Sequence, residues 1–118
     1  MSRLIVEAEA VNAWGQGIEE FEREGVGRAL VVSVTNADGE PVKELGGGAF
    51  DAYFLPPTPS ALSFEKLHIV HADEQRPGVY ILIGTASPQK LVLAGKHVFA
   101  VMVFKSGRMG QALTSLTV

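Results

Sequence analysis

Apolar and polar residues alternate along much of this chain, which is the pattern of β-strands whose successive side chains point to opposite faces. The clearest example is Arg28–Thr35, where Leu30, Val32 and Val34 occupy every second position. We expect these three side chains to face a core. Residues Ala49–Leu55 alternate in the same way and predict a second strand.

Three further segments are also predicted to form strands. Residues 4–9 place Glu7 and Glu9 on one side of an opening strand, so that strand has a wet face and lies near an edge. Residues 61–70 alternate less regularly, and residues 111–118 close the chain as a terminal strand.

Two runs are apolar on both faces, and the rest of the chain is organised around them. They are Val79–Ile83 and Val98–Phe104, both rich in β-branched and aromatic residues. A strand that is apolar on both sides is expected to be covered on both sides. If Tyr80, Leu82, Phe99, Val101 and Val103 face the core, another set of side chains points outward: Val79, Ile81, Ile83, Val98, Ala100, Met102 and Phe104.

Turn-forming residues separate the predicted strands. Asn36–Val42 predicts a reversal, and Gly46–Gly48 a bulge or flexible loop. Pro56–Ser60 ends a strand, His71–Gly78 is a polar loop, and Ser106–Gly110 is a hairpin turn. About seven short strands with no long helix predict an all-β, antiparallel two-sheet sandwich.

Composition restricts the classes of protein that fit. The chain has 118 residues, which predicts a single domain over 1–118. There is no cysteine, which excludes disulfides and a thiol nucleophile. A net charge of -3 with scattered basic residues does not favour a nucleic-acid partner, and no apolar run is long enough for a membrane-spanning helix. We see no signal peptide and expect a cytoplasmic protein if Met1 is the native start, or one whose signal has been removed.

Residues 1–27 are predicted to form the first strand followed by an irregular segment that covers part of the sheet. Trp14, Ile18 and Phe21 provide apolar side chains for that purpose, and Trp14 alternatively stacks on a sugar ring. The glutamates of Glu19–Glu24 are either a solvated face or a cation site, although the spacing of a calcium loop is missing.

His68 and His71 invite a metal-site hypothesis. Residues three apart on a regular strand point to opposite faces, so the two imidazoles converge only if the chain turns between them. Asp73 and Glu74 lie nearby and keep the hypothesis open, but we predict no metal or other cofactor.

Three stretches of the chain combine glycine or proline with apolar residues: Pro77–Ile83, Ala94–Val101 and the VTNADGEPV turn at 34–42. They resemble bacterial immunoglobulin-like modules, which carry PGxY and AGxYxFxV signatures in their final strands. The resemblance covers most of 28–118 and implies the immunoglobulin-like sandwich. It also implies that Tyr80 is a core tyrosine near a strand start, comparable to a tyrosine corner. His97 stands where the second signature usually has an aromatic residue.

Such modules usually act as spacers, adhesion elements or assembly parts, so the resemblance implies a structural role. A small transthyretin-like hydrolase is similar in length and class. This chain, however, ends in Leu116-Thr117-Val118 and lacks the closing tyrosine-arginine-glycine-serine motif of that family. No serine lies in a GxSxG elbow, so we predict that the protein is not an enzyme.

The outward side chains of the two apolar runs carry the functional hypothesis. If Val79–Ile83 and Val98–Phe104 are neighbours, these side chains form a patch of several hundred Å², a size that usually marks an interaction site. We therefore predict a structural or protein-interaction module that packs this sheet face against a second copy or a partner protein. The alternatives are that Val11–Phe21 covers the face, or that the protein is a carbohydrate- or calcium-binding module.

Overall fold

The computed structural model describes residues 3–11, 28–57, 64–86 and 93–118, and these residues form an all-β fold. A short 3-10 turn, η1 (Gly47–Ala49), leads into the third strand where a bulge or flexible loop was predicted. The strands are β1 (Ile5–Val11), β2 (Arg28–Thr35), β3 (Phe50–Leu55), β4 (Glu65–Arg76), β5 (Val79–Thr85), β6 (Lys96–Lys105) and β7 (Arg108–Thr117).

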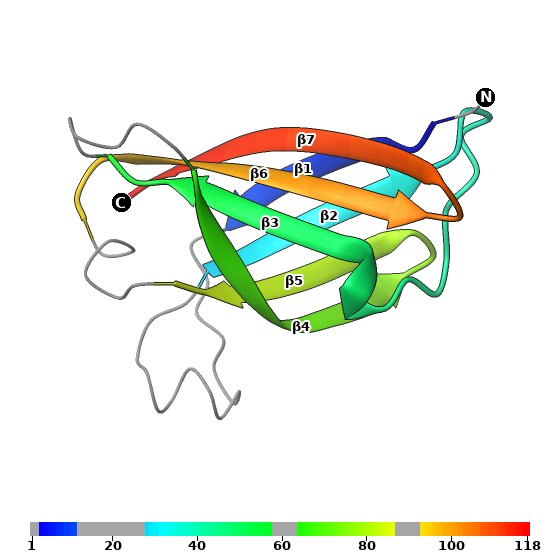
Figure 1. The fold of residues 1–118 in the computed structure, drawn as a ribbon, viewed down its shortest axis with the longest axis horizontal. Coiled ribbons are helices and arrows are strands. Elements are labelled where there is room, and N and C mark those ends of the chain that lie inside the picture. Colours follow the sequence, from blue (N-terminus) through cyan, green and yellow to red (C-terminus); the bar gives the residue numbers. More distant parts are fainter. Residues whose placement is uncertain (1–2, 12–27, 58–63, 87–92) are drawn as a thin grey trace.

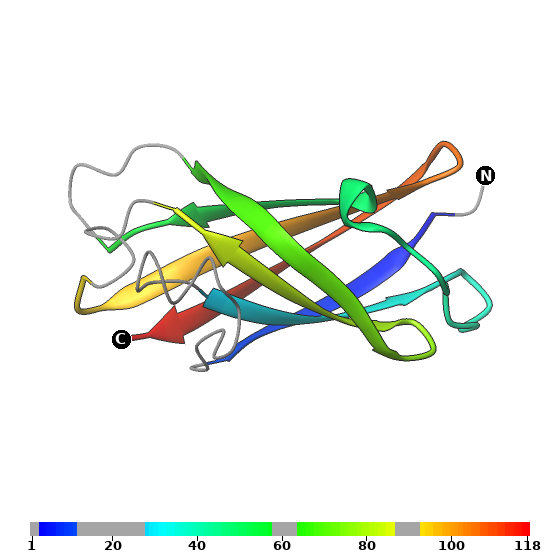
Figure 2. The ribbon, with the colours of Figure 1, turned by 90° about the horizontal axis from the view of Figure 1, so that it is seen from below.

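The strands form one seven-stranded antiparallel sheet in the order β1-β2-β5-β4-β3-β6-β7. Strand β4 joins the two halves, because Glu65–Leu67 pairs with β3 while His68–Arg76 pairs with β5. The sheet curls until its first and last strands lie side by side, so the molecule is barrel-like (Figures 1 and 2). The predicted all-β antiparallel class is confirmed. The described strands are joined in a single sheet, and a two-sheet sandwich is not confirmed.

Glycine at position 110 allows β7 to approach β1 closely. A Cβ atom at Gly110 would lie 2.5 Å from the carbonyl oxygen of Leu4, a distance that real Cβ atoms do not tolerate. The Leu4 amide donates a hydrogen bond to the Met109 carbonyl oxygen at 3.3 Å, and the Ala10 amide donates one to the Thr114 hydroxyl at 3.3 Å. Among the described residues, close packing and these two hydrogen bonds close the barrel, and no β1–β7 ladder is formed.

Alternate residues of every strand fill the interior. Leu30, Val32 and Val34 are fully buried, as predicted, and so are Tyr80 and Phe99. Gly84 leaves space on β5 for the Leu67 side chain, since a Cβ there would lie 2.5 Å from the Leu67 Cγ. Buried hydrophobic side chains form one continuous core: Leu4, Val6, Leu30, Val32, Val34, Val42, Leu45, Phe50, Ala52, Phe54, Leu67, Tyr80, Leu82, Phe99, Val101 and Val103.

Two predicted loops are wrong because strands occupy most of their length. Residues His71–Arg76 continue β4 and pair with β5, so only Pro77 and Gly78 make the turn. His71 and Asp73 are opposite outward residues of β5, whereas Glu74 is opposite the inward Tyr80. Polar side chains therefore occur on both faces, which is why the segment resembles a loop. Likewise, Arg108 already belongs to β7, and the hairpin turn shrinks to Ser106-Gly107.

The connection between β2 and β3 is fixed by side chains from β4 and β5. Tyr80, fully buried near the start of β5, donates its hydroxyl hydrogen to the Val42 carbonyl oxygen at 2.6 Å and accepts from the Leu45 amide at 3.2 Å. Burial raises the pKa of this hydroxyl. The position expected for Tyr80, a core tyrosine near a strand start, is confirmed, although its hydroxyl contacts a segment 38 residues upstream.

Glu74 holds the same connection from β4. Its two carboxylate oxygens accept hydrogen bonds from the Gly78 amide at 3.0 Å and the Glu44 amide at 3.1 Å. These bonds, that from Gly78 first, lower the pKa of Glu74. The short turn after β4 and the segment 42–45 are thereby joined through one carboxylate.

Candidate functional site

The outward strand positions that the sequence predicted to form one patch do not form one. Their two strands, β5 and β6, are separated in the sheet by β4 and β3. The premise that they are neighbours is therefore wrong. The side chains do lie on the outer side of the sheet, but in two groups, one on β5 and one on β6: Val79, Ile81 and Ile83, then Val98, Ala100, Met102 and Phe104.

The β5 group is largely covered by its own chain. Ile83 is only 9% exposed and packs with Ala29 of β2. Val11, Val70 and Ile81 pack around this pair. Val11 is the part of the predicted cover segment that the structure describes; Trp14, Ile18, Phe21 and Glu19–Glu24 lie outside the described residues.

The β6 group lies at the centre of a wider apolar surface. Strand β3 on one side pairs Leu55 with Val98 and Tyr53 with Ala100, and strand β7 on the other pairs Leu113 with Ala100. We call this surface the outer apolar face: Tyr53, Leu55, Val98, Ala100, Met102, Phe104, Met109 and Leu113.

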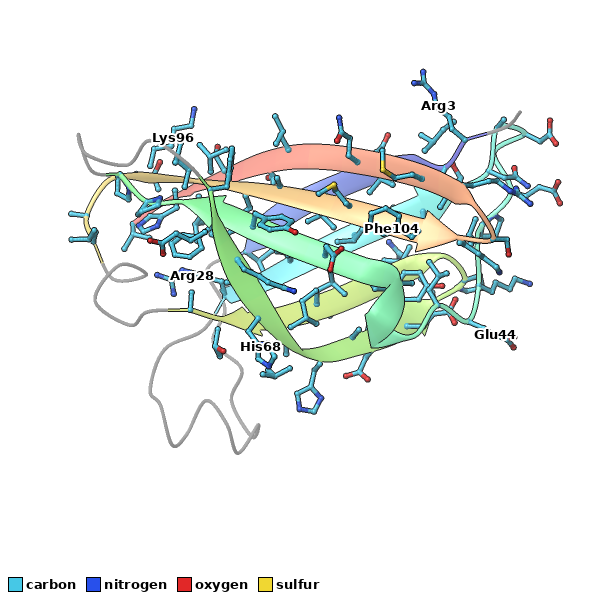
Figure 3. All side chains as sticks on the ribbon, in the orientation of Figure 1. Arg3, Arg28, Glu44, His68, Lys96 and Phe104 are labelled. Carbon is cyan, nitrogen blue, oxygen red and sulfur yellow. The ribbon has the colours of Figure 1, made fainter. Side chains whose placement is uncertain are left out.

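Several side chains of the outer apolar face are strongly exposed. Leu113 is 70% exposed, in the middle of β7. Phe104 and Met109 are directly opposite each other across β6 and β7, at 39% and 45% exposure. Figure 3 shows Phe104 on the outside of the sheet near one end of the molecule. Polar Asp51 and Gln111 flank Met102 within this surface. An isolated exposed leucine is ordinary, but several exposed apolar side chains on one side of adjacent strands are not.

Sequence reasoning missed half of the outer apolar face. Met109 and Leu113 share the outer side of the last strand with the polar Gln111 and Ser115, so the sequence of this strand carries only a partial apolar signal. Tyr53 and Leu55 were assigned to a strand whose neighbours in the sheet were not predicted. The alternation of residues within a strand does not show that β3 and β7 flank β6.

A β-bulge places His68 and His71 on the same outer side of β4. The register shifts between Ile69 and His71, so His68 is opposite Thr85 and His71 is opposite Ile83, two residues of the same face of β5. The expectation of opposite faces is therefore wrong, because it assumed a regular strand. Within the described parts of the chain, however, no three potential ligands among His, Cys, Asp and Glu come together as a metal site.

Two buried polar side chains lie near the start of β6 and the start of β2. His97 is fully buried, and its Nε2 donates a hydrogen bond to the Leu93 carbonyl oxygen at 2.7 Å. Arg28 is 2% exposed, and burial lowers its pKa. Figure 3 places Arg28 and Lys96 at the end of the molecule opposite Arg3 and Glu44. His97 thus fills a core position, as the aromatic residue of the resembled signature would.

Comparison of the chain with protein-family models, with curated proteins and with solved structures finds no match. Among the described residues, no helix is long and apolar enough to cross a membrane. The structure itself is therefore the source of a functional hypothesis.

Proposed function

We propose that the protein is a non-catalytic structural or protein-interaction module that assembles through the outer apolar face. The observation that carries this proposal is the exposure of Leu113, Met109 and Phe104 on the same outer side of the adjacent strands β6 and β7. Removing such side chains from water favours association by about 25 cal/mol per Å² of apolar area.

The occupant that fits best is a second copy of this chain. Strand β6 lies in the middle of the face with apolar side chains on both flanks, so the surface is complementary to itself. The charged residues at outward positions of β3, β6 and β7 are Asp51 and Lys96, whose opposite charges cancel. A copy is therefore not repelled by like charge.

The size of the face predicts a weak dimer. Three strands about 4.8 Å apart, with about seven residues each at about 3.3 Å per residue, cover roughly 350 Å² of sheet. The area that two such faces bury is below the roughly 1,200 Å² of a stable interface, even when the uneven surface of the side chains is added. We expect self-association that depends on concentration in the micromolar range or above.

The finer fold assignment belongs to the same proposal. We infer an immunoglobulin-like arrangement, supported by a strand order that separates β1-β2-β5-β4 from β3-β6-β7. This is the ABED and CFG order of constant-type immunoglobulin domains. The continuous β4 strand is the departure, because it pairs with both halves.

Dilution followed by nuclear magnetic resonance tests the proposed role. Amide shifts of β6 and β7 are expected to change with protein concentration, while those of β1 and β2 stay constant. Shifts that are independent of concentration throughout the chain would refute self-association through this face.

A further inference from the structure

A depression of about 390 Å³ lies at the end of the barrel where the β2–β3 connection meets the β6–β7 hairpin. Three basic side chains line it: Lys43 from the connection, and Lys105 and Arg108 from the hairpin. Glu44 is the acidic residue of the same lining. Figure 3 shows Glu44 at this end of the molecule, away from Lys96 and Arg28.

The hairpin holds two like charges directly opposite each other. Lys105 pairs with Arg108 across a two-residue turn, in which Ser106 and Gly107 both have positive φ, at 52° and 77°. Such a turn fixes the register of the flanking strands. Like charges at directly opposed positions are destabilising, so this pair lowers the free energy of unfolding.

Lys43 is held in place from both sides. The Val42 amide donates to the Val34 carbonyl oxygen at 2.9 Å, while the Val42 carbonyl oxygen accepts from the Tyr80 hydroxyl. On the other side, the Glu44 amide donates to Glu74. Glu44 has φ 59°, a left-handed conformation that is unfavourable for a residue with a side chain. A strained residue in a fixed segment is typical of binding sites.

We propose that this depression binds an oxyanion of the phosphoryl class. Lys43, Lys105 and Arg108 supply three positive charges, and the carboxylates of Glu44 in the lining and of Glu74, which interacts electrostatically with Lys43, supply two negative ones, so one net positive charge remains. A bound oxyanion offsets the repulsion between the directly opposed Lys105 and Arg108. This site is separate from the outer apolar face and does not depend on self-association.

Titration with inorganic phosphate at low ionic strength, followed by amide shifts of the full chain, tests the proposal. Saturable shifts are expected at 43–44 and 105–108, whereas sodium chloride at equal ionic strength does not produce them. O-phosphoserine as a second ligand distinguishes the source of the phosphoryl group. Tighter binding of O-phosphoserine indicates a phosphorylated side chain, and equal binding indicates free phosphate.

A pair of charge-matched variants decides whether the site is specific. The double variant Lys105→Gln/Arg108→Gln is expected to lose about tenfold or more in phosphate affinity, since it removes two of the three cations. The control Lys66→Gln/Lys96→Gln removes the same charge elsewhere and should change affinity less than about twofold. An equal loss in both variants means an adventitious ion only, and absence of saturable shifts in the wild type equally overturns the proposal.

Discussion

The hydroxyl group of Tyr80 lies 2.6 Å from the carbonyl oxygen of Val42, although 38 residues separate the two in sequence. The same hydroxyl accepts the Leu45 amide hydrogen, so one buried oxygen satisfies two backbone groups of the β2–β3 connection. This contact orders the segment that presents Lys43.

Replacing Tyr80 by phenylalanine removes both hydrogen bonds and leaves two backbone groups without them. The Tyr80→Phe variant is expected to lose about 1–3 kcal/mol in free energy of unfolding, measured by urea denaturation. The control Tyr53→Phe changes a half-exposed outward tyrosine and should stay near the wild type. Equal stability of the two variants would contradict the role assigned to the Tyr80 hydroxyl.

Glu74 makes stability depend on pH in a defined direction. Hydrogen bonds from the Gly78 and Glu44 amides lower the pKa of Glu74 below its ordinary value of 4.5. A carboxyl group whose pKa is lower in the folded than in the unfolded state stabilises the fold at pH values above its unfolded pKa. This stabilisation is lost as the pH falls through the folded pKa. The stability advantage of the wild type over Glu74→Gln should therefore be present at neutral pH and vanish in acid. Denaturation of both proteins at several pH values measures this difference. An advantage that persists below the folded pKa would argue against the proposed bonds.

Gly110 is expected to be intolerant of a side chain because β1 backbone occupies the space. The Gly110→Ala variant forces Leu4 away from β7 and should cost about 1–3 kcal/mol in unfolding free energy. Gly48 has open space around its Cβ position, so Gly48→Ala is the matched control. Thermal or urea unfolding that gives both variants wild-type stability would show that β1 and β7 are not in close contact.

Lys105→Glu should stabilise the protein, because it turns a like-charge pair with Arg108 into an opposite-charge pair. The expected gain is about 0.2–1 kcal/mol at low salt, and it should shrink at high salt. Lys96→Glu is the control, since Lys96 is opposite the uncharged Thr117. Urea denaturation at two salt concentrations makes the comparison; a loss of stability in Lys105→Glu would show that the hairpin charges do not repel.

Local patterning was sufficient to predict single strands. The bounds of β2 follow from its alternation, and Leu30, Val32 and Val34 lie in the core as expected. Alternation failed in β4, where a bulge after Ile69 reverses the faces and polar residues occur on both sides of the strand. A bulge adds one residue without a sequence signal of its own, so His68 and His71 were placed on opposite faces.

The neighbours of each strand were beyond the reach of the sequence. The apolar runs of β5 and β6 look alike, but their outer side chains lie apart because β4 and β3 pair between them. The order of strands depends on the connections between them and on the packing of the whole core. The sequence of a single strand contains neither. The β6 residues lie on the outer side of the sheet, as expected, and those of β5 lie apart from them, while the role of either group as an interface stays a prediction.

Sedimentation equilibrium over a range of concentrations measures the central claim most directly. The wild type is expected to move from 12.6 kDa toward twice that mass as concentration rises, while Leu113→Glu stays at 12.6 kDa and remains folded. Val79→Glu carries the same change at an outward apolar position on β5, which β4 and β3 separate from β6, and it should still associate. A wild type that remains at 12.6 kDa up to about millimolar concentration, or a Val79→Glu variant that dissociates as fully as Leu113→Glu, would contradict assembly through the outer apolar face.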